Sequence, residues 1–211
     1  VTVANFCDLA QSGYYDGLKF YRIVEGFCLQ GGTKGNSSAG NDATLPPIIG
    51  EFYENDVDNP LADEFRRGTV AMARTGVYNS AKTTFFITLA TTENVSQSLD
   101  GQYAAFGQID DAGMQTVDAI VKDYLKYATG EMGAINNPKD MPVIEYITIV
   151  HTGIIDESVL VERTLLPRFL EWLGMASDAD DDGRVVKLLH GRGDRSADEA
   201  HADDDDPFEW Y

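Results

Sequence analysis

The stretch FYRIVEGFCLQGG, from Phe20 to Gly32, places an arginine inside an apolar run and ends on two adjacent glycines. Residues 18–24 and 27–30 are rich in aromatic and aliphatic side chains and are separated by a Glu-Gly pair. This pattern predicts two strands joined by a tight turn. Because successive side chains of a strand point to opposite faces, we expect Arg22 to face a groove while its apolar neighbours pack inward.

Similar short runs recur along the first 150 residues. Strand-like runs occupy 68–74, 84–90, 103–109 and 143–150, and apolar residues at helical spacing occupy 3–10 and 114–124. Many short strands with only two helices favour a closed antiparallel barrel over a parallel doubly wound sheet. The fold class predicted from these patterns is therefore mainly β.

The charge balance excludes several classes of partner. The chain has 35 acidic residues against 16 basic ones and a formal net charge of −19. A field of this sign repels phosphate backbones and anionic lipid surfaces, so no nucleic-acid partner is expected. No window holds the roughly 18 consecutive apolar residues that a membrane span needs, so no membrane insertion is expected. These features predict a soluble protein and favour a cytoplasmic location, with export or an organelle as alternatives.

One acidic segment partly matches a calcium-binding loop. Asp178, Asp180 and Asp182 stand at positions one, three and five of an EF-hand pattern. The twelfth position should be a bidentate glutamate but is Leu189. An acidic linker is therefore the preferred interpretation, and the two cysteines show no metal-ligand spacing either. We expect no metal site.

The C-terminal part of the chain differs in character from the first 150 residues. We expect a barrel domain over 1–150, a helical extension over 151–192 and an acidic, disordered tail over 193–211. The extension carries a broad apolar stripe over 158–175. Such a stripe either packs on the barrel, which is the first expectation, or docks a protein partner.

Four segments together resemble the cyclophilin family of peptidyl-prolyl cis-trans isomerases. They occur in the family's order and at its usual intervals, and read VANFCDLAQSGYYDGLKFYRIVEGFCLQGG, GTVAMART, NSAKTTFFITL and LDGQYAAFG. The MART spelling, the eight residues from Val77 to Thr84 and the aromatic Tyr103 are similar to bacterial members. A set of four ordered motifs is far more specific than any one of them.

The resemblance implies a closed, eight-stranded antiparallel barrel capped by two helices. The family has two strands before the helix that begins near Val3, and they do not precede it in this sequence. Three explanations stay open: the sequence is a fragment, another chain supplies the strands, or the barrel is incomplete and exposes sheet edges. The first is the preferred one.

The resemblance also implies an activity, rotation about X-Pro bonds in proline-containing polypeptides, and it implies no cofactor. Arg22 matches the family's essential arginine, and Gln30 matches the glutamine that braces this arginine or binds the substrate backbone. The predicted substrate-binding residues match the proline pocket and its neighbouring groove: Phe27, Met72, Ala73, Thr84, Phe86, Leu99 and Tyr103. Any one of these apolar residues alone would be interpreted as core, and only their order with Arg22 and Gln30 indicates a site.

Several positions depart from the family pattern. Tyr21 replaces a histidine, Cys28 replaces a methionine, Thr84 replaces a glutamine and Ser98 replaces a tryptophan. The loss of one hydrogen-bonding side chain costs about 0.5 to 1.5 kcal/mol, so reduced activity is expected rather than none. The alternative is a binding or scaffold module of the same fold that holds a proline-containing partner without turnover.

Overall fold

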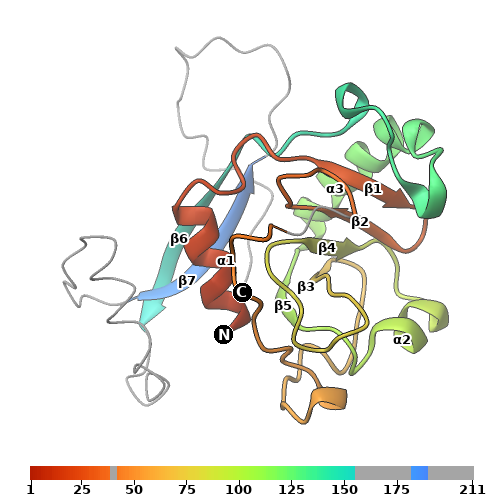
Figure 1. Ribbon diagram of the computed structural model, residues 1–211. Helices are drawn as coiled ribbons and strands as arrows, with labels where there is room; N and C mark the ends of the chain where they lie inside the picture. Colours follow the sequence, from red (N-terminus) through yellow and green to blue (C-terminus); the bar gives the residue numbers. More distant parts are fainter. Residues whose placement is uncertain (39–41, 155–181, 190–211) are drawn as a thin grey trace.

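The computed structural model describes residues 1–38, 42–154 and 182–189 (Figure 1). Its helices are α1 (Thr2–Gln11), α2 (Glu93–Leu99) and α3 (Asp111–Tyr124), with 3-10 turns at Tyr53–Asn55, Leu125–Tyr127, Glu131–Gly133 and Pro138–Asp140. Its strands are β1 (Phe20–Val24), β2 (Cys28–Gly31), β3 (Thr69–Met72), β4 (Phe85–Thr88), β5 (Ala105–Gln108), β6 (Tyr146–Ile154) and β7 (Asp182–Leu189). The strands predicted within the first 150 residues are all confirmed.

The strands form two antiparallel sheets instead of one closed barrel. The larger sheet has the order β1-β2-β4-β3-β5, and the smaller one pairs β6 with β7. Within the described residues, the β1 edge meets the segment that leads into β6 through the isolated bridges Lys19↔Val143 and Arg22↔Ala134 and scattered hydrogen bonds, without a continuous strand ladder. The predicted closure is therefore corrected: alternation in a sequence identifies strands, but it does not specify the partners of the edge strands.

The two predicted helices are confirmed as α1 and α3, and the short α2 was not predicted. Only Val95 and Leu99 of α2 are buried, which leaves too few apolar positions for a periodic signal. Its beginning is fixed by Thr92, whose side chain accepts a hydrogen bond from the backbone N–H of Val95 at 3.3 Å.

Part of the predicted helical extension is strand. Residues 151–154 belong to β6, and β7 lies where a helix was expected. Because β7 begins at Asp182, a strand of 8 residues covers the end of the candidate calcium loop from its fifth position onward, whereas Asp178 and Asp180 lie outside the described residues. The apolar stripe at 158–175 and the tail at 193–211 also lie outside the described residues.

Two buried clusters cover the two faces of the five-stranded sheet. Neighbouring residues of β4 belong to different clusters, since Phe85 and Ile87 pack in the larger one and Phe86 packs in the smaller one. The larger cluster receives apolar side chains from α1 and α3, including Phe6, Ala10, Met114, Val117 and Ile120. The smaller cluster is covered by α2 and the loop before β3, through Phe52, Ala62, Phe65, Val95 and Leu99.

A β-bulge explains why Arg22 and its apolar neighbours separate. The register passes from Phe20↔Gly31 to Arg22↔Gln30, so Tyr21 is the extra residue on β1. Phe20 and Ile23 both join the larger cluster although they are three residues apart, a spacing that simple alternation does not allow. The expectation that Arg22 faces away from these residues is confirmed.

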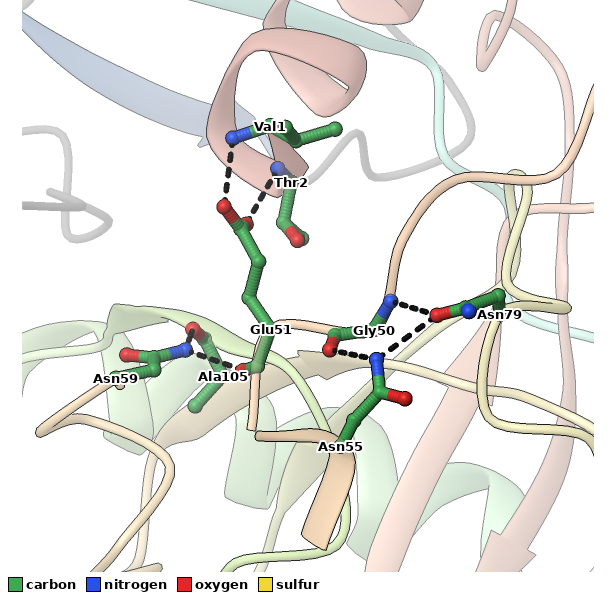
Figure 2. Close-up of polar contacts among 8 residues, drawn as sticks. All are labelled: Val1, Thr2, Gly50, Glu51, Asn55, Asn59, Asn79 and Ala105. Carbon is green, nitrogen blue, oxygen red and sulfur yellow. Dashed lines mark hydrogen bonds and ion pairs between the residues drawn. The ribbon is translucent and has the colours of Figure 1, made fainter. Parts of the chain in front are cut away.

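A long loop carries Glu51 to the beginning of α1 (Figure 2). The Glu51 carboxylate accepts hydrogen bonds from the backbone N–H of Thr2 at 2.7 Å and from the backbone nitrogen of Val1 at 2.8 Å. The backbone carbonyl of Glu51 accepts a hydrogen bond from the side-chain amide of Asn59, which also donates to the backbone carbonyl of Ala105 in β5. The loop is thus anchored between α1 and the edge of the sheet.

No helix among the described residues is long and apolar enough to cross a membrane.

Candidate active site

A row of paired residues crosses the large sheet from edge to edge. Arg22 pairs with Gln30, Gln30 pairs with Phe86, Phe86 pairs with Ala71, and Ala71 pairs with Ala105. Directly paired residues point to the same face of an antiparallel sheet. The register alone therefore places a cation, an amide, a large ring and two small side chains in one line on the face that bears the smaller cluster.

Three hydrogen bonds orient the guanidinium of Arg22. Nη1 donates to Oε1 of Gln30 at 2.8 Å and to Sγ of Cys28 at 3.4 Å, and Nε donates to the carbonyl of Met132 at 2.8 Å. The side-chain amide of Gln30 donates in turn to the hydroxyl of Tyr21 at 2.6 Å. Among the described residues, Nη2 of Arg22 donates no hydrogen bond. It remains available to a ligand.

The carbonyl that accepts from Arg22 is placed by a left-handed turn. Met132 has φ 53° and Gly133 has φ 82°. A Cβ on Gly133 would lie 2.2 Å from the carbonyl oxygen of Ile23, so only glycine lets the turn approach β1 this closely. The turn therefore depends on Gly133 to bring the Met132 carbonyl to Arg22.

A cavity of about 180 Å³ adjoins the guanidinium. Six of its nine lining residues come from β1, β2, β4, the β1–β2 turn and α2, and are Arg22, Phe27, Cys28, Gln30, Phe86 and Leu99. The other three are Ala73 and Arg74, which follow β3, and Tyr103, which lies between α2 and β5. Phe27 lies with its ring centroid 6.0 Å from the guanidinium carbon of Arg22. The cavity thus joins an apolar floor to a cation.

Most of the predicted site residues meet at this cavity, and two do not. Met72 is only 1% exposed and belongs to the larger cluster on the opposite face of the sheet. Thr84 is buried and does not line the cavity; its carbonyl accepts from the N–H of Ala73 at 2.8 Å. Thr84 therefore contributes a backbone contact that holds the segment bearing Ala73.

Burial keeps the two polar neighbours of Arg22 uncharged. Burial raises the pKa of the Cys28 thiol to about 11, and the nearby Arg22 charge offsets only part of that increase. Burial likewise raises the pKa of the Tyr21 phenol. Arg22 is therefore the charged member of this group at neutral pH, and neither side chain supplies a nucleophile there.

Sequence reasoning missed Arg74 and Met132. Arg74 lies within the quoted GTVAMART motif and lines the cavity, but a strand-end arginine has no periodic signal that distinguishes it from a solvated one. Met132 contributes a backbone carbonyl, a group that every residue carries. A second cavity of about 690 Å³ opens beside Arg22 and Gln30, between residues 35–38 and 131–141. No sequence motif indicated it.

Comparisons with known proteins agree with this geometry. The family model described as cyclophilin type peptidyl-prolyl cis-trans isomerase/CLD matches residues 1–154. Peptidyl-prolyl cis-trans isomerase A of Dickeya dadantii is 35% identical over 145 residues, which cover 68% of this chain and 70% of that protein. Peptidyl-prolyl cis-trans isomerase B of Escherichia coli is 35% identical over 153 residues, which cover 70% of this chain and 85% of that protein. Both relatives are bacterial, as the sequence features predicted.

A solved structure extends the likeness to the fold. The cyclophilin-type peptidyl-prolyl cis-trans isomerase of Cryptosporidium parvum, determined in the presence of the dipeptide Ala-Pro, matches with a TM-score of 0.54 at 25% identity. The match covers 69% of this chain and 82% of that one. The alternative of a binding module without turnover is not favoured by these relatives. The chain therefore belongs to the cyclophilin family and is a peptidyl-prolyl cis-trans isomerase.

Proposed function

We propose that the cavity beside Arg22 is the isomerase site, that it receives the proline ring of a polypeptide, and that Arg22 is the catalytic residue. The observation that carries this proposal is the row Arg22–Gln30–Phe86, which places a guanidinium with a free N–H next to a cavity that the apolar side chains of Phe27, Phe86 and Leu99 also line. Residues 1–154, the part that the family model matches, form the catalytic domain. The substrates are X-Pro bonds of polypeptides, including those of folding chains.

The chemistry follows from the nature of the X-Pro bond. Amide resonance opposes rotation with a barrier of about 18 to 20 kcal/mol. As the bond twists, conjugation is lost and the prolyl nitrogen becomes a better hydrogen-bond acceptor. A cation that donates to the prolyl side stabilises this twisted amide more than either planar isomer, and only such differential binding accelerates the reaction.

Each group of the site has a distinct part in this mechanism. Phe27, Phe86 and Leu99 hold the proline ring, so that the acyl side turns instead. Gln30 is a positioning residue, because its carbonyl oxygen fixes Nη1 of Arg22 and leaves Nη2 to the substrate. The Met132 carbonyl fixes Nε in the same way. Because the guanidinium is already oriented, no free energy of reorganisation is needed when the amide twists.

An assay on Arg22 variants tests the proposal. Arg22→Ala is expected to lower kcat/KM for a proline peptide about 10²- to 10³-fold, the range found when one transition-state donor is removed. Arg22→Lys keeps the positive charge but lacks the planar guanidinium with its fixed N–H directions. Its kcat/KM is expected to lie between that of wild type and that of Arg22→Ala. Arg66→Ala is the matched control, because Arg66 donates from Nε to Gln108 away from the cavity. Wild-type kcat/KM in Arg22→Ala would refute the proposal.

A further inference from the structure

Arg74 borders the same cavity as Arg22 and is held in a different way. Its guanidinium carbon lies 4.6 Å from the ring centroid of Tyr103, 5.1 Å from that of Tyr78 and 5.2 Å from that of Phe52. A cation within about 6 Å of an aromatic ring is attracted by the negative face of the ring. Three such contacts hold the guanidinium in one place at the rim of the cavity.

The charge of Arg74 has no counterion among the described residues. Nε donates to the carbonyl of Gln102 at 2.8 Å and Nη1 donates to the carbonyl of Thr75 at 2.9 Å, and both acceptors are neutral. In the same part of the chain, Nη2 donates no hydrogen bond and no carboxylate lies within 4 Å. Glu54 accepts instead from the hydroxyl of Tyr78 at 3.0 Å. A fixed cation with an unused donor favours an anionic ligand group.

The loops that carry two of the rings are fixed before a ligand arrives. Oδ1 of Asn79 accepts from the backbone N–H of Gly50 at 2.9 Å and from the side-chain amide of Asn55 at 2.8 Å (Figure 2). The rings of Phe52 and Tyr78 meet edge to face with their centroids 5.3 Å apart. Arg74 is thus preorganised, so binding an anion there requires little further ordering.

We propose that Arg74 is a specificity-determining residue that makes the enzyme prefer X-Pro bonds with an acidic side chain close to the proline. This inference rests on the proposed function, in which the proline ring enters the cavity of about 180 Å³ that Arg74 also lines. An extended chain advances about 3.3 to 3.6 Å per residue. The aspartate or glutamate that reaches Arg74 therefore lies within two residues of the proline.

The test uses matched peptides and the full chain. Glutamate or glutamine is placed in turn at the two positions before and the two positions after proline, and kcat/KM is measured by NMR exchange. At one position, wild type is expected to favour glutamate about fivefold, the upper end of the range for an exposed charge pair, because Arg74 is held in place before the ligand binds. Arg74→Gln is expected to bring the ratio to about one. Arg74→Lys, which keeps the charge but not the fork, is expected to give about twofold.

Lys122→Gln is the control for net charge, because it removes one positive charge from an exposed position on α3 and should keep the fivefold ratio. Equal rates for glutamate and glutamine at all four positions, or a preference that survives in Arg74→Gln, would overturn the inference. Should Arg74→Gln not fold, the Arg74→Lys ratio decides. Absence of isomerisation for every peptide would contradict the proposed function instead. NMR titration of the same peptides would then still test Arg74, and equal Kd values would overturn its role.

Discussion

Arg22 and Arg74 border one cavity, yet their surroundings differ in kind. Arg22 is oriented by an amide oxygen, a sulfur atom and a backbone carbonyl, which fix the directions of its N–H groups. Arg74 donates only to two backbone carbonyls, those of Gln102 and Thr75, and three aromatic rings surround its guanidinium in addition without taking up a donor. Hydrogen bonds give direction, which a reaction needs, whereas ring faces give position and leave the charge available for recognition. The same side chain thus suits two tasks.

The largest expected effect concerns the turn that orients Arg22. Gly133→Ala forces a Cβ to within 2.2 Å of the carbonyl oxygen of Ile23 at a φ of +82°. Steric overlap and left-handed strain together should lower the free energy of unfolding by about 3 kcal/mol. They should also lower kcat/KM, because the Met132 carbonyl moves away from Arg22. Urea unfolding and the proline-peptide assay measure both.

Gly17→Ala is the matched control for Gly133→Ala. Gly17 also has a left-handed φ, +74°, but a Cβ there meets nothing within 4 Å. The Gly17→Ala protein should therefore lose about 1 kcal/mol of its free energy of unfolding from backbone strain alone and keep its isomerase activity. Equal stability of the two variants would show that the turn at 131–133 is not held tightly against β1.

A smaller effect tests whether water is excluded from the Cys28 thiol in the lining of the cavity. The pKa of Cys28 is raised from 9.0 to about 11 in the folded protein. The unfolded chain therefore loses the thiol proton first, so stability is complete below pH 9 and falls between pH 9 and 11. At pH 10 the loss should be about 1.4 kcal/mol.

Urea unfolding of wild type and Cys28→Ala at pH 8 and pH 10 isolates this contribution, since other groups that titrate at high pH affect both proteins. Wild type should lose about 1.4 kcal/mol more than Cys28→Ala over this interval. An identical loss in the two proteins would mean that the thiol is hydrated in the folded protein and that Cys28 is not buried as described.

The smallest expected effect concerns the aromatic rings that hold Arg74. Tyr78→Leu removes one ring, whose centroid is 5.1 Å from the guanidinium carbon, and leaves the cavity lining intact. One such contact contributes about 0.5 to 1 kcal/mol, so the glutamate-to-glutamine ratio should fall about twofold. Tyr53→Leu, which alters a ring that is 76% exposed, should leave the ratio unchanged. The peptide series used for Arg74 provides the measurement.

The sequence predicted the strands and the identity of the family, because alternation and ordered motifs are local signals. It did not predict the open sheet or β7, since the pairing of edge strands depends on contacts between distant segments. Arg22, Gln30 and Phe86 could be found because each stands in a recognisable motif. Tyr103 was found in the same way. The Met132 carbonyl could not be found, because every residue carries a carbonyl. The rings of Phe52 and Tyr78 could not either, because they come from loops held by the side-chain amides of Asn55 and Asn79.

One measurement separates catalysis by Arg22 from recognition by Arg74 most directly. It is kcat/KM of Arg22→Ala for the glutamate and glutamine peptides at the position that wild type prefers. Both values should fall about 10²- to 10³-fold while their ratio stays near five. Wild-type values for both peptides would contradict the catalytic role of Arg22, because the reaction would then not depend on the oriented guanidinium.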